Sequence, residues 1–219
     1  MAHVPRNLGL SIFQLALARN KMAFVSGPRQ VGKTTLSRQI GQHFSVQSYK
    51  NWDQDAVAKI WTKDPEGLLT DFNFSKVKEN RLLILDEIHK SKNWKNKLKG
   101  IYDVHQDELK ILVTGSARLN VYKKGGDSLL GRYLHFRLHP FSLGELSNEN
   151  VLSPEHALQK ILKPSDEMAK LNRYLADLLQ FSGFPEPYLT KDERLHNIWR
   201  KDRRDRVIRE DLRDLNRVQ

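Results

Sequence analysis

The sequence has 219 residues, enough for one main domain and a smaller appendage, and its 39% hydrophobic and 29% charged residues are typical of a globular protein rather than a disordered one. It contains no cysteine, which excludes disulfides and thiolate zinc sites and favours the reducing cytoplasm. The formal net charge of +11 makes a polyanion such as nucleic acid a candidate partner, although a solvated lysine surface explains such a charge about equally well.

The first apolar stretch, residues 8–18 (LGLSIFQLALA), predicts a helix rather than a secretory signal. Two polar residues interrupt the run, whereas its apolar residues recur at steps of three and four, as on one face of an amphipathic helix. This predicted face comprises Leu8, Ile12, Leu15 and Ala18. No run reaches the roughly 18 apolar residues that span a bilayer, so no membrane partner is expected.

Beyond residue 20, short apolar runs alternate with helical patterns, which predicts an α/β fold with a parallel sheet and helices on both faces. The clearest runs are almost continuously apolar, as expected for strands that are covered on both faces. The predicted strands are 22–26, 81–87 and 110–116, with weaker candidates at 44–49 and 133–139. The predicted helices are 33–43, 54–62, 88–102 and 117–122.

After Pro140 the strand signals stop, and the rest of the sequence predicts a small helical segment. We therefore predict an α/β domain at residues 1–144 and a helical C-terminal segment at residues 145–219. Residues 191–219 carry ten basic and seven acidic side chains in mixed order, which is typical of a solvated helix face.

The string GPRQVGKTT, residues 27–35, matches G-x-x-x-x-G-K-[ST], the phosphate-binding loop, and lies between a predicted strand and a predicted helix. Glycine at both ends lets successive backbone N–H groups curl around a polyphosphate, and the helix that follows points its positive N-terminus at the same phosphates. Lys33 can reach the β- and γ-phosphate oxygens, and the Thr34 hydroxyl can ligate a bridging Mg²⁺. The predicted nucleotide-binding residues are Gly27, Pro28, Arg29, Gln30, Val31, Gly32, Lys33, Thr34 and Thr35.

Two carboxylates, Asp86 and Glu87, end the strand predicted at 81–87. They therefore lie at the carboxyl edge of the sheet, where open α/β folds bind their ligands. Asp86 is predicted to hold Mg²⁺, directly or through water, and Glu87 to polarise the water that attacks the γ-phosphorus. Together with the loop, the acidic pair predicts magnesium-dependent hydrolysis of a nucleotide.

Two features of the sequence indicate which nucleotide is the substrate and which reaction it undergoes. A guanine-specific protein normally carries Asn-Lys-x-Asp, whereas the two Asn-Lys pairs of this sequence have Ala23 and Lys99 at the Asp position, which disfavours GTP and favours ATP. A small-molecule kinase transfers phosphate to its substrate and needs no acidic base beside the metal carboxylate. Glu87 therefore favours hydrolysis over transfer.

The third clear strand ends in Thr114 and Ser116, small polar groups that can hydrogen-bond a γ-phosphate or its attacking water. The alternative is ordinary turn chemistry around Gly115. Arg132 follows a glycine-rich stretch, and Arg118 lies nearby in the sequence. An arginine that reaches the γ-phosphate, within the chain or from a neighbouring subunit, can raise turnover about 10³- to 10⁵-fold, although either arginine could instead be a surface residue.

Five segments carry a resemblance to a known family: GPRQVGKTTL, LLILDEIHKSKNWKNKLKGIYD, LVTGSARL, SLLGRYLHFRLHPFSLGEL and FSGFPEPY. In this order, over most of residues 8–215, they resemble bacterial and archaeal AAA-type ATPases that carry a C-terminal domain of unknown function. The resemblance implies a P-loop NTPase core of the additional-strand type, with the Asp86 strand separated from the loop strand by the Thr114 strand. It also implies a winged-helix-like helical segment after the core and a further domain that this chain lacks.

Two functions follow as hypotheses. The first is an enzyme, a magnesium-dependent ATPase whose hydrolysis is coupled to a conformational change of the helical segment. The second is a nucleotide-gated nucleic-acid-binding module with slow or no hydrolysis, which the net charge and the basic tail motivate. A third, a partner-binding scaffold that keeps the loop as a relic, has no sequence feature in its favour. A homo-oligomer is a candidate assembly, because Arg132 could then act on a neighbouring subunit.

Overall fold

The structure, a computed structural model, describes residues 4–76, 79–116, 119, 128–147 and 168–206. The chain divides into two compact units, one formed by Arg6–His139 and the other by Met1–Pro5 with Pro140–Gln219. The sequence places the boundary slightly later, after residue 144. In the second unit, Phe141 packs against Leu146 and Tyr188, so the helical unit includes the residues directly after Pro140.

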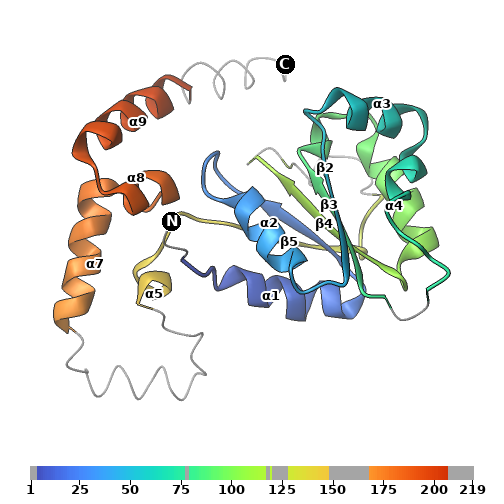
Figure 1. Ribbon diagram of the computed structural model, residues 1–219, viewed down its shortest axis with the longest axis horizontal. Helices are drawn as coiled ribbons and strands as arrows, with labels where there is room; N and C mark the ends of the chain where they lie inside the picture. Colours follow the sequence, from blue (N-terminus) through green and yellow to red (C-terminus); the bar gives the residue numbers. More distant parts are fainter. Residues whose placement is uncertain (1–3, 77–78, 117–118, 120–127, 148–167, 207–219) are drawn as a thin grey trace. The chain divides into compact units, whose positions relative to one another are not determined.

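The described part of the first unit folds around a sheet of five parallel strands in the order β2-β3-β4-β1-β5 (Figure 1). The strands are β1 (Met22–Ser26), β2 (Val46–Asn51), β3 (Arg81–Asp86), β4 (Leu109–Gly115) and β5 (Tyr133–Arg137). All neighbouring pairs are parallel, which confirms the predicted α/β fold and its five strands. As the resemblance implies, β4 separates the strand that ends in Asp86 from β1.

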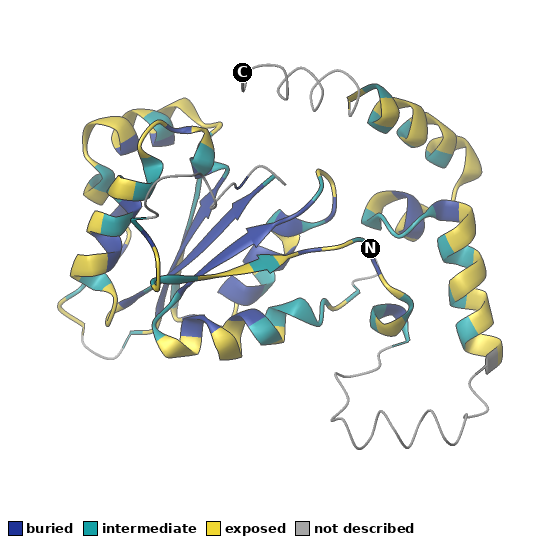
Figure 2. Ribbon diagram, turned by 180° about the vertical axis from the view of Figure 1, so that it is seen from behind, coloured by how far each residue is buried: buried dark blue, intermediate teal, exposed yellow. Residues whose placement is uncertain are grey.

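The central strands are buried because their sequences are almost continuously apolar. Every residue of β1 and β3 is buried, and Figure 2 shows the middle of the sheet as its most buried part. Such strands require cover on both faces. The edge strands β2 and β5 are mostly half-buried or exposed, which explains why their strand signals in the sequence are weak.

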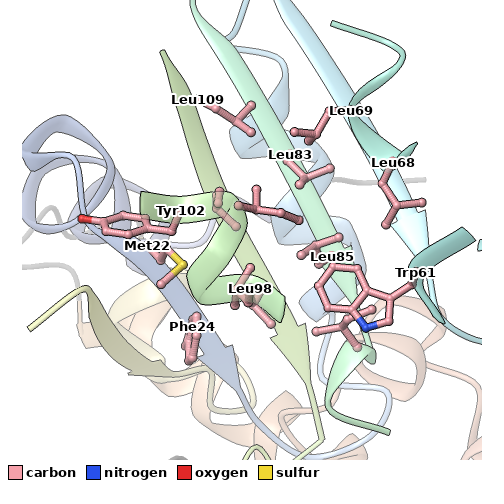
Figure 3. Packing of buried hydrophobic residues seen from close by; sticks show 14 of the residues in the cluster. Met22, Phe24, Trp61, Leu68, Leu69, Leu83, Leu85, Leu98, Tyr102 and Leu109 are labelled. Carbon is pink, nitrogen blue, oxygen red and sulfur yellow. The ribbon is translucent and has the colours of Figure 1, made fainter. Parts of the chain in front are cut away.

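Helices cover both faces of the sheet, α1 (Leu8–Leu15) and α2 (Lys33–Gly41) on one, α3 (Asp55–Lys63) and α4 (Trp94–His105) on the other (Figure 1). The larger core cluster lies under α3 and α4, where Trp61 and Leu98 pack with alternate residues of the central strands (Figure 3). Strand side chains alternate between the two faces, so the neighbouring residues point to α2. Ile84, for example, lies beside Gly41.

The helix predicted over 88–102 is wrong as one element. The structure has a 3-10 turn, η3 (Ile88–Lys90), followed by α4. Glu87 and Asn93 have φ angles of 59° and 56°, in the left-handed region, which a regular helix cannot contain. The ends of α2 and α3 lie within two residues of those predicted. The helix predicted at 117–122 falls outside the described residues apart from Leu119.

The predicted N-terminal helix is confirmed, but only part of its predicted face is buried. Ile12 is fully buried, as is Ala16 directly after the helix, whereas Leu15 is 45% exposed. The helix ends at Leu15, and Ala18 lies in the 3-10 turn η1 (Leu17–Arg19). Because that turn winds more tightly than an α-helix, the α-helical spacing that aligned Ala18 with Leu8 does not hold.

The described part of the second unit, residues 4–5, 140–147 and 168–206, contains helices and no strand. The helices are α5 (Leu143–Leu146), α7 (Met168–Phe181), α8 (Pro185–Thr190) and α9 (Glu193–Arg206). In the first unit, a 3-10 turn, η2 (Pro65–Leu69), follows α3. A capping box between Ser142 and Glu145 starts α5. The likeness to a winged helix stays a prediction. None of the described helices is long and apolar enough to cross a membrane.

Candidate active site

The loop between β1 and α2 needs glycine at two positions. Gly32 precedes α2 with a φ of 97°, in the left-handed region. A Cβ on Gly27 would lie 2.4 Å from the carbonyl oxygen of Leu138, which is too close. Gln30 also has a positive φ of 63°, a conformation that costs free energy and tends to occur at functional sites. The two motif glycines therefore lie where a side chain is not tolerated.

Lys33, the first residue of α2, is buried against the loop. Its ammonium group donates hydrogen bonds to the carbonyl oxygens of Gly27, at 3.0 Å, and Pro28, at 2.9 Å. Burial lowers the pKa of Lys33, whereas the carboxylates of Glu87 and Asp86 act in the opposite direction. The positive charge is thus held in the curve of the loop, as the phosphate-binding motif requires.

The other predicted loop residues differ in exposure. Arg29, Gln30 and Thr35 are exposed. Val31 is fully buried, and its carbonyl oxygen accepts a hydrogen bond from the Arg6 guanidinium at 3.1 Å. The loop is therefore anchored on one side by the core and by the N-terminal segment.

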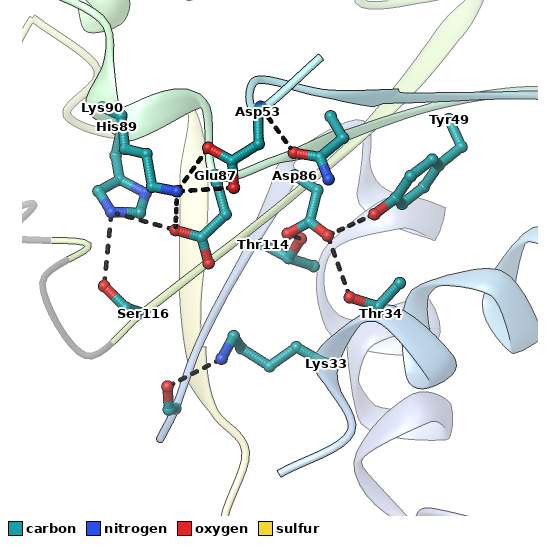
Figure 4. A network of polar contacts seen from close by, with 12 residues as sticks. Lys33, Thr34, Tyr49, Asp53, Asp86, Glu87, His89, Lys90, Thr114 and Ser116 are labelled. Atoms are coloured by element: carbon teal, nitrogen blue, oxygen red, sulfur yellow. Dashed lines mark hydrogen bonds and ion pairs between the residues drawn. The ribbon is translucent and has the colours of Figure 1, made fainter. Parts of the chain in front are cut away.

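Asp86, the last residue of β3, is 5% exposed, and hydroxyl groups surround its carboxylate (Figure 4). The Thr34 hydroxyl donates to Oδ2 at 3.0 Å, and the Thr114 hydroxyl donates to Oδ1 at 2.5 Å. The Tyr49 hydroxyl also donates to Oδ2, at 2.5 Å. The structure thus brings together Thr34, Asp86 and Thr114, which the sequence placed in one site.

Thr34 and Asp86 fit a magnesium ion. Mg²⁺ prefers hard oxygen ligands and is usually bound by one or two carboxylates, water and the phosphates of a substrate. Within the described residues, no group of three or more His, Asp or Glu lies together as a ready metal cage. The donor set therefore suits an ion that is shared with a phosphate ligand.

The sequence analysis did not identify Tyr49 as a site residue. It lies on β2, where the strand register pairs Asn51 with Asp86, two residues further along. Burial and the hydrogen bond to Asp86 both raise the pKa of Tyr49, so its hydroxyl stays protonated and remains a donor. Only knowledge of the strand order could have identified Tyr49 as a site residue, because Tyr49 can reach Asp86 only if β2 lies beside β3.

Glu87 lies directly beside Asp86, with its carboxylate close to two basic side chains. Its Oε2 is 3.6 Å from His89 Nε2 and 3.8 Å from Lys90 Nζ (Figure 4). Lys90 also donates to both carboxylate oxygens of Asp53, at 2.7 and 2.8 Å. Burial raises the pKa of Glu87, and the charge of Lys90 partly opposes this. The role of Glu87 as a base stays a prediction.

Ser116 follows β4 and approaches His89 rather than Asp86. Its Oγ lies 3.5 Å from His89 Nε2, the ring nitrogen that faces Glu87. A Cβ on Gly115 would come within 2.6 Å of the same imidazole, so the glycine permits this close approach. The turn chemistry around Gly115 and a role of Ser116 at the site are therefore compatible.

Arg132 lies at the opposite end of the sheet. It precedes β5, and its carbonyl oxygen accepts a hydrogen bond from the N–H of Met22, the first residue of β1. The phosphate-binding loop follows Ser26, at the far end of a strand about 13 Å long. The Arg132 guanidinium donates to both carboxylate oxygens of Asp103, at 2.6 and 3.1 Å. This position argues against action within the chain, whereas action on a neighbouring subunit stays a prediction; Arg118 lies outside the described residues.

Structural comparison finds one solved structure that shares the fold of this chain and another that is similar to it at a lower score. The Saccharomyces cerevisiae Hsp104–ADP complex is 16% identical, covering 90% of this chain and 31% of that chain, with a TM-score of 0.54. The Aeropyrum pernix ORC1 protein in complex with DNA is 18% identical, covering 83% of this chain and 60% of that chain, with a TM-score of 0.46. At such low identity the likeness concerns the fold alone.

Sequence comparison identifies a longer relative and a family. An uncharacterized protein of Methanocaldococcus jannaschii, MJ1544, is 28% identical over 204 residues, which are 91% of this chain and 43% of that protein. This chain therefore spans less than half the length of its relative. The family profile described as "AAA domain" matches residues 19–147, more than half of the chain. The chain belongs to the AAA domain family.

Proposed function

We propose that the chain binds ATP with Mg²⁺ and hydrolyses it, and that hydrolysis drives a conformational change of the helical unit. The observation that carries the proposal is the 3.0 Å hydrogen bond from the Thr34 hydroxyl to the Asp86 carboxylate. It joins the phosphate-binding loop to the acidic end of β3, the two parts that a magnesium nucleotide needs side by side.

The loop provides the binding half of the mechanism. The backbone N–H groups of residues 27 and 29–34, together with the N-terminus of α2, bind the phosphates. Lys33 exchanges its two carbonyl partners for phosphate oxygens, which accept hydrogen bonds more strongly because they are charged. Thr34 and Asp86 would hold Mg²⁺, which would supply positive charge against the charge that develops on the phosphates.

The end of β3 provides the chemical half. Glu87 accepts a proton from the water that attacks the γ-phosphorus, and its raised pKa makes it a better base than an exposed carboxylate. Thr114 and Ser116 orient the phosphate or that water. The likeness to a protein described as an ADP complex supports adenine over guanine nucleotides. The cysteine-free composition supports the cytoplasm.

Two substitutions test the proposal. Lys33→Ala should abolish ATP binding in calorimetry, with Lys21→Ala as a control because its ammonium group bonds to Gly131 at the other end of the sheet. Glu87→Gln should keep ATP binding and lower turnover about 10²- to 10⁴-fold. Equal ATP affinity in the wild type and the Lys33 variant would contradict the binding site. Normal turnover in the Glu87 variant would contradict the assignment of the base.

The distribution of charge favours nucleic-acid binding as a second candidate function. Residues 6–139 carry 23 basic and 12 acidic side chains, whereas residues 140–219 carry 14 of each, so the net charge of +11 lies in the first unit and the second unit is neutral as a whole. Residues 90–99 contain five lysines and no acid. Two of these, Lys90 and Lys97, bond to Asp53 and to backbone carbonyls of α3.

Two other lysines of this segment, Lys92 and Lys99, test that candidate. A variant with Lys92 and Lys99 both replaced by Gln should bind oligonucleotides more weakly, and its affinity should depend less steeply on salt concentration, because fewer phosphate contacts release fewer counterions. Lys59→Gln with Lys63→Gln, on α3, is the matched control. Affinity that is indifferent to these lysines, to salt and to nucleotide would exclude the second function.

A further inference from the structure

Asp86 is satisfied by hydroxyl groups, whereas other carboxylates of the same unit pair with cations. Asp71 accepts a hydrogen bond from the Lys50 ammonium group, and Asp53 from Lys90. Asp86 is 5% exposed and, within the described residues, its carboxylate forms no salt bridge. A buried carboxylate without a cation is costly, and hydrogen bonds from three hydroxyls offset that cost. Its charge is therefore held in place and left available for a cation from outside the chain.

Among the three donors, Tyr49 has no place in the nucleotide motif. It shares Oδ2 of Asp86 with Thr34, whereas the third donor bonds to Oδ1. Two donors on one oxygen fix how the carboxylate is rotated, and they keep Oδ2 beside the Thr34 hydroxyl. The tyrosine itself is fixed, because β2 pairs with β3 and because the Arg38 guanidinium lies 5.1 Å from the centre of its ring.

We propose that Tyr49 is a positioning residue for the magnesium site, where its hydroxyl holds the Asp86 carboxylate in the orientation that an ion shared with Thr34 and the nucleotide phosphates requires. This inference rests on the proposed function. Hydrogen-bond partners of metal ligands typically change metal affinity by about 10- to 100-fold when they are removed. Tyr49 touches neither the nucleotide nor the attacking water in this account, so it acts through Asp86 alone.

The test is Tyr49→Phe, which deletes the hydroxyl and keeps the ring beneath Arg38. ATP binding is measured by calorimetry in EDTA and then over a range of Mg²⁺ concentrations. The variant should bind ATP like the wild type in EDTA, and it should need about 10- to 100-fold more Mg²⁺ for half of the metal-dependent gain in affinity. The Mg²⁺ dependence of ATP hydrolysis should shift equally, with the maximal rate largely recovered at saturating Mg²⁺.

Tyr102→Phe is the matched control. Its hydroxyl donates to the carbonyl oxygen of Asn20 at 2.7 Å, at the other end of the sheet, so its loss should leave the Mg²⁺ requirement unchanged. Thermal unfolding of both variants in EDTA reports any general effect on the fold. An unchanged or lowered Mg²⁺ requirement in Tyr49→Phe overturns the inference, and so does an equal loss of affinity with and without Mg²⁺. A wild type that binds no ATP overturns the proposed function as well, which distinguishes the two failures.

Discussion

The two ends of the parallel sheet treat their charged side chains differently. At the amino ends of the strands, charges are matched by opposite charges within the protein: Arg132 pairs with Asp103, and the Arg81 guanidinium lies 3.6 Å from the Glu79 carboxylate. At the carboxyl ends, Asp86 bonds only to hydroxyl groups within the described residues, and Lys33 donates to two loop carbonyls. Both ends belong to the same five strands.

The difference indicates that stability and ligand binding are divided between the two ends. Charged side chains that pair with each other hold the ends of the strands in place and are less able to bind a ligand. Charges held by neutral groups can exchange those partners for a stronger one, such as a phosphate or a metal ion. Open α/β sheets bind their ligands beyond the carboxyl ends of the strands, which agrees with this division.

Arg132→Ala is expected to have the largest effect, and it tests whether a residue at the amino end of the sheet has a catalytic role. If Arg132 reaches the nucleotide of a neighbouring subunit, the variant should lose about 10³- to 10⁵-fold in turnover. Mixing it with Glu87→Gln should then restore activity, since each Glu87→Gln subunit still supplies its arginine to an intact site. Steady-state ATP hydrolysis at several mixing ratios measures this.

The same mixing experiment can also contradict the action of Arg132 on a neighbouring subunit. If mixing restores nothing, and if turnover per wild-type chain does not rise with protein concentration, Arg132 does not act between subunits. The division between the two ends then holds without exception.

The fold was largely predictable because its central strands are buried and therefore appear in the sequence as local apolar runs. Continuous apolar runs located β1, β3 and β4 to within one residue. The single helix predicted over 88–102 failed because the backbone is left-handed at Asn93, and Asn93 is not a glycine that would signal the break. The prediction that Ala18 shares the face of α1 failed because the chain switches to a 3-10 turn after Leu15.

The site was predictable where it depends on sequence motifs and not where it depends on strand order. The contact of Thr34 with Asp86 follows from two motifs. The Tyr49 contact required knowing that β2 flanks β3, which a single sequence does not fix. The location of Arg132 could also have been predicted from the sequence, because a residue that directly precedes a strand of a parallel sheet must lie at the amino end of that sheet.

Gly27→Ala tests how tightly the carboxyl end of the sheet is packed. Its Cβ would lie 2.4 Å from a backbone oxygen of Leu138, so we expect a loss of about 1–3 kcal/mol in the free energy of unfolding, together with weaker ATP binding. Gly100→Ala on α4 is the control, because a Cβ there meets nothing within 4 Å and should stabilise the helix by about 0.5–1 kcal/mol. Urea unfolding measures both, and equal effects would contradict the tight packing.

Lys90→Met tests the electrostatics of Glu87. Only the ionised carboxylate acts as a base, so turnover falls as the pH falls through the pKa of Glu87. Burial raises that pKa and Lys90 lowers it, so removing the lysine charge should move the acid limb of the rate profile to higher pH. Asp53 raises the pKa of Glu87, so Asp53→Asn should move the limb the other way. A limb that stays in place in both variants would assign it to a different group.

Asp103→Asn should have the smallest effect. The pair that it breaks is partly exposed, with side-chain exposures of 32% for Arg132 and 40% for Asp103, and solvent weakens such pairs. We expect a smaller change in the urea midpoint than Gly27→Ala gives, and retained ATP hydrolysis. Asp86→Asn makes the same chemical change at the other end and should abolish the magnesium-dependent gain in ATP affinity. If Asp103→Asn lowered that gain as well, charges at the amino end would also serve the ligand, and the two ends would not differ in function.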